Sequence, residues 1–252
     1  MQSSPSCLAL TQQKRRYIAL GRVALEIGKL FDLRRPGKGL QYLSFLMAQF
    51  PIHNVAAFIL AGGASERMGQ DKALLELGGV PMVMRAAQLA QPYVASVAIV
   101  APFERYAHLG LRAIPDRWPD AGPLGGIATA LASTSAEWNL ILGCDLPHLT
   151  PEWVAWLISR ALDSPAHAVV PESQGGLEPL AAMYRQCCGA AFTTAVERGV
   201  RRVTEGLSEI LFERVSLAEW RDLDPKGTLF ENMNTPEDYA KARRRTKNLA
   251  SP

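Results

Sequence analysis

The chain has 252 residues, of which 48% are hydrophobic and 20% are charged. This composition is typical of a soluble globular domain, and no apolar run approaches the roughly 20 residues of a membrane-spanning helix. Residues 1–46 hold eight basic and two acidic residues, which leaves 19 basic and 22 acidic residues in the remainder. This mildly acidic remainder, without an aromatic-basic module, argues against binding of nucleic acid.

Residues 1–46 form a basic extension that does not continue the strand–helix pattern of the rest of the chain. Charged residues interrupt its apolar stretch, so it does not fit a secretory signal. We expect that Met47 is the natural start, or that the extension is a poorly ordered tail. We expect one folded domain to span residues 47–245, followed by a tail at residues 246–252.

The four cysteines show neither zinc-ligand spacing nor a disulfide framework, which favours a cytoplasmic location. From Val55 onward, short apolar runs alternate with longer amphipathic segments, the pattern of repeated strand–helix units. We therefore predict an α/β, Rossmann-like single domain with a mostly parallel sheet flanked by helices.

The elements expected in the first half are strands and helices in alternation. Strands are predicted at 55–60, 97–100, 111–114 and 139–143, and helices at about 81–93, at 123–133 and from Pro151, with Thr150 as N-cap. The second half is less regular. Strands are predicted at 168–170, 180–184 and 211–215, with a turn at 174–176, a helix over about 187–198 and a last helix from Pro236, with Thr235 as N-cap.

The first strand runs into a glycine-rich loop. Ala61, Gly62 and Gly63 leave backbone N–H groups unobstructed, which suits an anion or a nucleotide. Arg67 and Lys72 follow closely in the chain. The guanidinium of Arg67 can donate several hydrogen bonds to phosphate oxygens, and the ammonium of Lys72 supplies a compact positive charge. The loop is neither a Walker loop nor a dinucleotide-binding fingerprint. From these residues alone, a phosphate-binding loop and a flexible turn with exposed charges remain equally open.

Two acidic residues follow later strands. Asp145 ends the predicted strand at 139–143, where ligands of parallel sheets bind, and it is a candidate Mg²⁺ ligand. The alternative is that it caps a turn before Pro147. Asp116 precedes a glycine-rich segment at 121–126, where backbone can approach a flat ligand. Its carboxylate could accept hydrogen bonds from guanine, or it simply ends its strand.

Taken together, these motifs resemble those of the molybdenum cofactor guanylyltransferase family. The resemblance covers about residues 55–245 and is carried by motifs that stand in this order: Leu-Ala-Gly-Gly-x-Ser-x-Arg-Met-Gly-x-Asp-Lys-x-Leu-Leu, Asp followed by Gly-Pro-Leu-x-Gly, Cys-Asp-x-Pro, Gly-x-Arg-Arg-Val and Asn-x-Asn-Thr-Pro-Glu-Asp. The first motif marks the wider nucleotidyltransferase superfamily, and the full set is more specific. The resemblance implies the nucleotide-diphospho-sugar transferase type of fold.

The resemblance also implies an activity, namely transfer of GMP from GTP to Mo-molybdopterin with Mg²⁺, giving Mo-molybdopterin guanine dinucleotide and pyrophosphate. It implies no nucleic-acid or membrane partner, and transient contact with molybdoenzymes or their chaperones. The resemblance assigns the nucleotide to Leu60, Ala61 and Gly62, the phosphates to Arg67 and Lys72, guanosine to Asp116, GTP and Mg²⁺ to Asp145, and the pterin to Arg202, Asn232 and Asn234.

The chain departs from the family pattern at two places. Val100-Ala101-Pro102 stands where relatives can place an asparagine, and Glu178-Pro179 stands where some have His-Pro. Both departures concern substrate contacts, not the metal or phosphate elements. Cys144, beside Asp145, is interpreted as a buried small residue rather than a nucleophile.

Two other functions remain open from the sequence. A cytidylyltransferase acting on molybdopterin or on a sugar or polyol phosphate would share the fold. Relatives that use CTP tend to carry Leu-Ala-Ala-Gly, whereas Gly62 here leaves room for the 2-amino group of guanine. The other alternative is a non-catalytic nucleotide sensor or molybdopterin carrier. Lys72 together with Asp145 argues against it, because binding alone does not require both residues.

Overall fold

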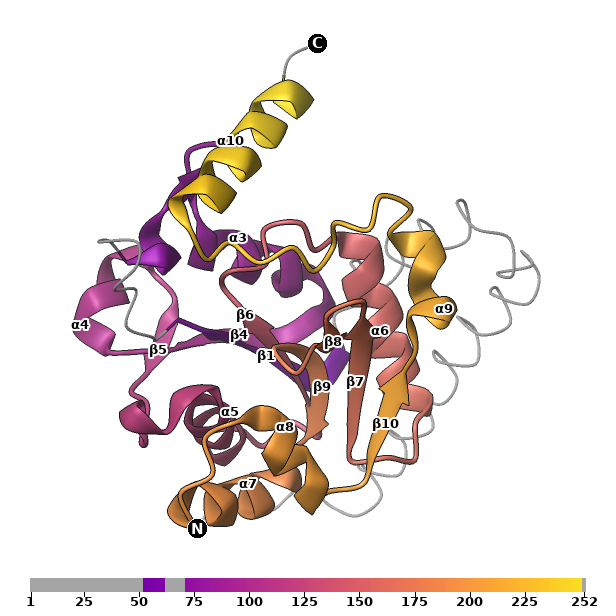
Figure 1. Ribbon diagram of the computed structural model, residues 1–252. Helices are drawn as coiled ribbons and strands as arrows, with labels where there is room; N and C mark the ends of the chain where they lie inside the picture. Colours follow the sequence, from indigo (N-terminus) through magenta and orange to yellow (C-terminus); the bar gives the residue numbers. More distant parts are fainter. Residues whose placement is uncertain (1–51, 62–70, 251–252) are drawn as a thin grey trace.

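The computed structural model describes residues 52–61 and 71–250, and the extension predicted at residues 1–46 lies outside this part (Figure 1). The described chain is built around one eight-stranded sheet with the strand order β10-β7-β9-β6-β1-β4-β5, and β8 pairs with β7. None of the described helices is long and apolar enough to cross a membrane. The proposed domain limits of 47 and 245 stay a prediction.

The strands of the large sheet are short, and most pairs are parallel. They are β1 (Ile52–Leu60), β4 (Val94–Val100), β5 (Arg112–Ile114), β6 (Trp138–Gly143), β7 (Ala168–Ser173), β8 (Gly176–Leu177), β9 (Ala181–Arg185) and β10 (Phe212–Val215). The pairs β1–β4, β1–β6, β4–β5 and β7–β10 are parallel. β9 runs antiparallel between β6 and β7. A separate hairpin joins β2 (Glu76–Leu77) to β3 (Val80–Pro81).

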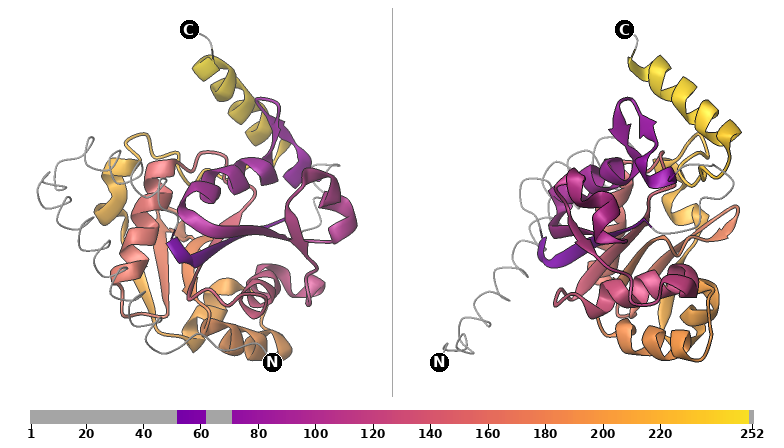
Figure 2. Two further views of the ribbon diagram at one scale, coloured as in Figure 1. Left: turned by 180° about the vertical axis from the view of Figure 1, so that it is seen from behind. Right: turned by 90° about the vertical axis from the view of Figure 1, so that its left-hand side faces the viewer.

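Helices cover both faces of the sheet (Figures 1 and 2). One face carries α3 (Met82–Ala90), α4 (Phe103–Tyr106), α6 (Pro151–Asp163) and α9 (Leu217–Trp220), and the other carries α5 (Gly122–Ala132), α7 (Cys188–Glu197) and α8 (Val203–Gly206). Short 3-10 turns connect these elements at Lys72–Leu74, Gln91–Tyr93, Ala107–Leu109, Pro119–Ala121, Leu207–Glu209 and Arg221–Leu223. The last helix, α10 (Pro236–Ala250), projects away from the body.

The sequence of β1 shows why the sheet is buried on both sides. Val55 and Ile59 pack into the core on the α3/α6 side, whereas Phe58 packs into the core on the α5/α7 side. All three side chains are almost completely buried. A strand buried on both faces reads as one continuous apolar run, as expected for the centre of a parallel sheet.

The predicted fold class is confirmed, and the longer elements fall close to their predicted limits. Thr150 caps α6 by accepting a hydrogen bond from Trp153 N at 3.3 Å. Thr235 caps α10, since its Oγ1 accepts a hydrogen bond from Asp238 N at 3.1 Å. The β2–β3 hairpin and the short helices α4, α8 and α9 were not predicted, because such elements have little periodicity of their own.

A small third core links the hairpin to α10. Its buried residues are Leu77, Met82, Met233 and Ala242. Tyr239 Oη donates a hydrogen bond to Glu76 O at 2.9 Å, so the helix is tied to the hairpin at a second point. The hairpin follows Lys72 in the chain and α10 follows Asn234, so this core fixes the two segments relative to each other.

Candidate active site

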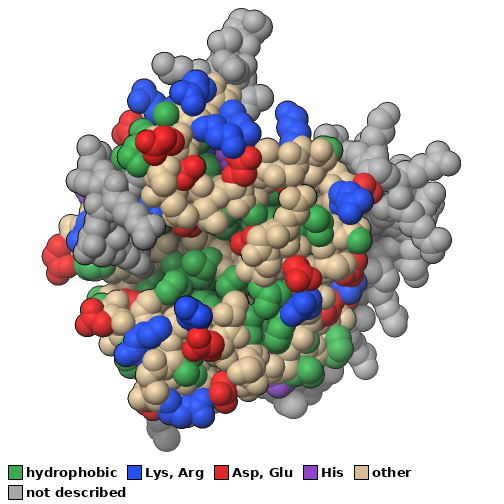
Figure 3. All heavy atoms as spheres, viewed as in Figure 1, with side chains coloured by type: hydrophobic (Ala, Val, Ile, Leu, Met, Phe, Trp, Pro, Cys, Tyr) green, Lys and Arg blue, Asp and Glu red, His purple; other side chains and the backbone are tan. Residues whose placement is uncertain are grey.

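The carboxyl ends of four parallel strands meet at one edge of the sheet. Leu60 at the end of β1 lies in register with Val100 of β4 and with Gly143 of β6, and Val100 pairs with Ile114 of β5. Figure 3 shows one face of the molecule, which is hollowed across its middle, with apolar side chains in the hollow and charged side chains around it. Ligands of open parallel sheets bind beyond such strand ends.

Lys72 is held in a short turn by its neighbour Asp71. One oxygen of Asp71 accepts a hydrogen bond from Ala73 N at 3.0 Å, and the other accepts one from Tyr106 Oη at 2.8 Å. Lys72 Nζ donates a hydrogen bond to Asn234 Oδ1 at 2.6 Å. The predicted phosphate lysine and a predicted pterin residue, 162 positions apart in the chain, are therefore in direct contact.

Asp145 lies beside this pair, at the end of β6. Met233 N donates a hydrogen bond to Asp145 O at 2.9 Å, so the segment that carries Asn234 crosses directly over Asp145. Burial raises the pKa of the Asp145 carboxyl above its ordinary value, although its own backbone N–H and the charge of Lys72 act in the opposite direction. The carboxylate is thus poorly solvated, and an additional cation would stabilise its ionised form.

Asp145 suits a cation that arrives together with a nucleotide. In the described part of the chain, no group of three or more His, Cys, Asp or Glu residues could enclose a metal ion. Mg²⁺ takes one or two protein carboxylates and completes its coordination with phosphate oxygens and waters. One poorly solvated carboxylate beside the ammonium group of Lys72 fits that requirement.

Asp116 lies further along the same edge, beyond β5. Its Oδ1 accepts hydrogen bonds from Thr129 Oγ1 at 2.7 Å and from Trp118 N at 3.0 Å. Its Oδ2 is turned toward Gly126, where an added Cβ would lie 3.9 Å from Oδ2 and 3.4 Å from the Leu60 side chain. A surface suited to a flat base lies here. It is formed by the strand end at Leu60, the backbone of Gly126, which carries no side chain, and Asp116 Oδ2.

The two other glycines of this segment have packing roles. A Cβ on Gly125 would lie 2.6 Å from Trp118 O, so the close turn at 118–121 requires glycine there. Gly122 has a φ of +63° and lies against Arg201 O. Of the glycines in the 122–126 segment, Gly126 is therefore the one that faces Asp116.

The predicted pterin residues are placed differently from one another. Asn232 and Asn234 are exposed and flank the buried Met233 above Asp145. The side chain of Arg202 is 82% exposed, and its nearest ion-pair partner is Glu205 at 3.9 Å. The structure thus brings Asn234 to Lys72, whereas Arg202 faces solvent beside the start of α5.

Ala61 is buried at the end of β1 and donates from its N–H to Val100 O at 3.2 Å. Gly62 and Arg67 lie outside the described residues, and their assigned contacts stay predictions. Where relatives can place an asparagine after β4, this chain places α4, whose Arg105 and Tyr106 contact Asp71.

Three site residues were missed by sequence reasoning. Tyr106 is completely buried and supports Asp71, and Met233 joins the third core to Asp145. Glu178 lies near Asp145, whose negative charge acts on its pKa. Of the three, only Glu178 had a signal in the sequence, as a departure from the family pattern. Tyr106 and Met233 had none, because an aromatic or apolar residue is indistinguishable in sequence from an ordinary core residue.

Cys144 does not have the properties of a nucleophile. Burial raises the pKa of its thiol to about 12, and the charges of Asp145 and Asp71 act in the same direction. Because the thiolate is the reactive form, this thiol is inert at neutral pH. Cys144 is only partly buried, packed against the core on the α3/α6 side, so the predicted lack of reactivity agrees with this environment but the predicted full burial does not.

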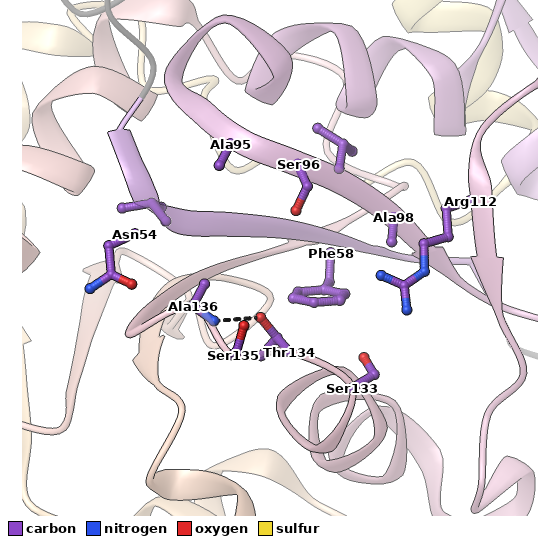
Figure 4. Close-up of a pocket in the computed structure, with 12 residues that line it drawn as sticks. Asn54, Phe58, Ala95, Ser96, Ala98, Arg112, Ser133, Thr134, Ser135 and Ala136 are labelled. Carbon is purple, nitrogen blue, oxygen red and sulfur yellow. Dashed lines mark hydrogen bonds between the residues drawn. The ribbon is translucent and has the colours of Figure 1, made fainter. Parts of the chain in front are cut away.

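A cavity of about 250 Å³ lies at the opposite edge of the sheet (Figure 4). Phe58 of β1 and Arg112 of β5 point into it, with β4 between these two strands. Its polar groups serve local structure: Ser133 Oγ donates to Ala130 O at 2.8 Å, and Thr134 Oγ1 accepts from Ala136 N at 3.0 Å. The cavity is therefore separate from the cluster around Asp145.

Comparison with known proteins identifies the family. Residues 57–211 match the model of the MobA-like NTP transferase domain. A probable molybdenum cofactor guanylyltransferase from Nostoc sp. is 38% identical over 197 residues, which cover 75% of this chain and 90% of the relative. Another of the same name, from Pelotomaculum thermopropionicum, is 35% identical over 73% of this chain and 90% of the relative.

A solved structure has the same fold. The molybdopterin-guanine dinucleotide biosynthesis protein A of Archaeoglobus fulgidus superposes with a TM-score of 0.68 at 22% identity, covering 77% of this chain and 99% of that protein. At this identity the likeness concerns the fold alone. Because the family model spans more than half of the chain and both relatives exceed 30% identity, the chain belongs to the MobA-like NTP transferase family and is a nucleotidyltransferase.

Proposed function

We propose that the enzyme transfers GMP from GTP to Mo-molybdopterin, forming Mo-molybdopterin guanine dinucleotide and pyrophosphate. The observation that carries the proposal is the convergence of Lys72, Asp145 and Asn234, from three distant segments, at the strand edge that also holds Asp116. The names of the two bacterial relatives support the same reaction. Membership of a transferase family favours an enzyme over a non-catalytic carrier.

The reaction needs positioning and charge neutralisation more than acid–base chemistry. An oxygen of the molybdopterin phosphate attacks the α-phosphorus of GTP, and the bond from that phosphorus to the β-phosphate oxygen breaks, which releases pyrophosphate. An ionised phosphate needs no general base. In this proposal Lys72 neutralises phosphate charge, and its hydrogen bond to Asn234 orients the ammonium group. In this proposal Arg67 adds a second cation.

Asp145 is the proposed ligand of Mg²⁺, which when bound would supply positive charge to neutralise the phosphates. Its backbone is held by Met233 and its carboxylate lies against Gly143, so the ligand is oriented before the nucleotide arrives. A preoriented carboxylate loses little conformational entropy on binding.

The choice of GTP over CTP rests on hydrogen-bond chemistry at Asp116. Guanine offers two adjacent donors, N1–H and the 2-amino group, and the Asp116 carboxylate supplies an acceptor. The matching edge of cytosine offers one donor beside an acceptor. Gly62 in the first loop, rather than the alanine of CTP-using relatives, supports the same choice. A CTP-dependent cytidylyltransferase is the alternative.

One experiment tests both the reaction and the base. The protein is incubated with Mg²⁺, Mo-molybdopterin and either GTP or CTP, and the dinucleotide product is identified by mass spectrometry. We expect the guanine dinucleotide, with turnover lost on chelation of Mg²⁺. A preference for CTP would overturn the base assignment, and absence of both products would overturn the reaction. The cytoplasmic location and contacts with molybdoenzymes or their chaperones stay predictions.

The glycine at the end of β6 is expected to be required for metal binding. A Cβ on Gly143 would lie 2.7 Å from Asp145 Oδ1 and 3.5 Å from Leu180 Cβ. Gly143→Ala should therefore displace the Asp145 carboxylate and lower the rate by about tenfold or more, as misplacement of about 1 Å can do. The Mg²⁺ concentration for half-maximal rate should rise. Gly175→Ala is the control, since the nearest atom to its added Cβ is a serine oxygen at 3.4 Å.

The tie between α10 and the hairpin is expected to support the position of Lys72. Tyr239→Phe removes the hydrogen bond to Glu76 O, which should cost about 1 kcal/mol of unfolding free energy. Because Lys72 precedes the hairpin and Asn234 precedes α10, loosening this tie should disturb their contact, so kcat should fall severalfold with little change in the KM for GTP. Thermal unfolding and steady-state kinetics measure the two effects. An unchanged kcat would show that the tie is purely structural.

A further inference from the structure

Glu178 lies at the same strand edge as Asp145, on the side of β6 that faces away from β1. Gly143 N, at the end of β6, donates a hydrogen bond to Leu180 O at 2.7 Å, so the segment before β9 flanks Asp145. Asp116 follows β5, on the opposite side of β1. Asp116, Asp145 and Glu178 therefore follow one another along the edge, with Asp145 in the middle.

Glu178 is held in one defined orientation. Its N–H donates to Pro171 O at 2.8 Å, and its carbonyl accepts from Ala181 N at 3.1 Å. Its Oε1 accepts a hydrogen bond from Ser173 Oγ at 2.5 Å. A carboxylate fixed both through its backbone and through its side chain can take part in specific recognition, because little rotational freedom remains to be lost when a ligand binds.

The carboxylate of Glu178 is half-buried. In the described part of the chain it forms no ion pair with Lys, Arg or His, whereas its neighbour Glu172 pairs with Arg214 at 3.3 Å. Burial raises the pKa of Glu178, the hydrogen bond from Ser173 lowers it, and the charge of Asp145 raises it further. Such an acceptor is stabilised when a ligand supplies N–H donors.

The position of Glu178 matches the side from which the second substrate must come. In the proposed reaction the nucleoside extends from Asp145 toward Asp116, and the α-phosphate reacts beside Lys72 and Asp145. The attacking phosphate and the group attached to it then occupy the remaining side of Asp145, along β9. The acceptor substrate therefore lies next to Glu178.

The chemistry of a pterin supplies the missing donors. Its ring carries N3–H beside a 2-amino group, the same pair of donors that guanine presents as N1–H and its 2-amino group. A carboxylate accepts two such donors side by side. Resting on the proposed function, we propose that Glu178 binds this edge of the pterin in the acceptor substrate and acts as a specificity-determining residue. Asp116 would then bind the guanine in one half of the cleft, and Glu178 would bind the pterin in the other half.

The test compares Glu178→Gln with Glu172→Gln. The glutamine at 178 keeps the size of the side chain and an acceptor for Ser173, but it presents an NH₂ group to the pterin donors. The KM for Mo-molybdopterin should rise about 10–100-fold while the KM for GTP changes less than about twofold, since a site built for a donor loses binding when its acceptor is replaced. Glu172→Gln makes the same change six positions away, where the side chain faces Arg214, and both KM values should stay near wild type.

Two further measurements make the outcome decisive. Glu178→Asp keeps both acceptor oxygens on a shorter side chain and should recover part of the lost affinity. Equilibrium dialysis with molybdopterin in the absence of GTP should show the same order of binding, with wild type above Glu178→Asp and Glu178→Gln weakest. Thermal unfolding should show that Glu178→Gln is as stably folded as wild type, because the Ser173 contact and the backbone hydrogen bonds are retained.

Each contrary result has a distinct meaning. An unchanged KM for Mo-molybdopterin in Glu178→Gln, or an equal rise in both KM values, overturns the inference. A higher Mg²⁺ requirement with unchanged pterin affinity also overturns it, and would assign Glu178 to the metal. If the wild-type protein makes no guanine dinucleotide, the proposed function fails before any variant is compared.

Discussion

Asp145→Asn is expected to abolish GMP transfer, with a loss of about 10³-fold or more, while the protein stays folded. The asparagine keeps the shape of the side chain but removes the negative charge that is proposed to bind Mg²⁺ beside Lys72. Loss of a group that stabilises charge in the transition state commonly costs about 10²–10³-fold, and loss of the metal ligand adds to that. Measurement of kcat at saturating GTP and several Mg²⁺ concentrations tests the effect.

Stability separates this role from a structural one. Because burial raises the pKa of Asp145, the folded protein holds a proton more tightly than the unfolded chain does. Below the ordinary aspartate pKa of about 3.9 both states are protonated. Stability then falls as the pH rises from that value through the raised pKa of the folded state, and the ionised carboxylate remains a cost above it.

Asparagine removes that cost, so the Tm of Asp145→Asn at neutral pH should equal or exceed that of wild type. The difference should disappear at a pH below the ordinary aspartate pKa. Transfer at the wild-type rate would refute the metal role of Asp145. A large fall in Tm together with the rate would mean instead that Asp145 is structural, as the turn-capping alternative requires.

Lys72→Met is expected to lower kcat by about 10²–10³-fold, because it removes the fixed positive charge proposed to neutralise the phosphates. Methionine keeps much of the apolar stem, so the packing of the turn at 72–74 should survive. Rapid-quench measurement of GMP transfer distinguishes a slower chemical step from slower product release. Lys226→Met is the control, since Lys226 is an exposed lysine in the turn after η7 (Arg221–Leu223).

A double-mutant cycle then tests the contact between Lys72 and Asn234. Asn234→Ala alone should lower kcat less than Lys72→Met does, because the charge remains but loses its orientation. In the Lys72→Met background, Asn234→Ala should have little further effect if its main role is to orient the ammonium group. Fully additive losses would contradict that role and favour an independent contact of Asn234 with substrate.

The sequence predicted the fold where one local signal was strong. Continuous apolar runs marked β1 and β6, and Pro151 and Pro236, each preceded by a threonine cap, marked the starts of α6 and α10. These signals are local because strand burial and helix capping depend on residues close together in the chain. The antiparallel direction of β9 is not local, since the reversal of the chain depends on which strand it pairs with.

For the site, the sequence by itself determined the chemical groups: a lysine, acidic residues after β5 and β6, and the Asn232–Asn234 element. It could not determine that Lys72 bonds to Asn234, that Met233 holds Asp145, or that Glu178 and Asp116 lie on opposite sides of Asp145. Those relations join segments up to 162 positions apart. Only tertiary packing of α10 against the hairpin, and the order of strands in the sheet, brings them together.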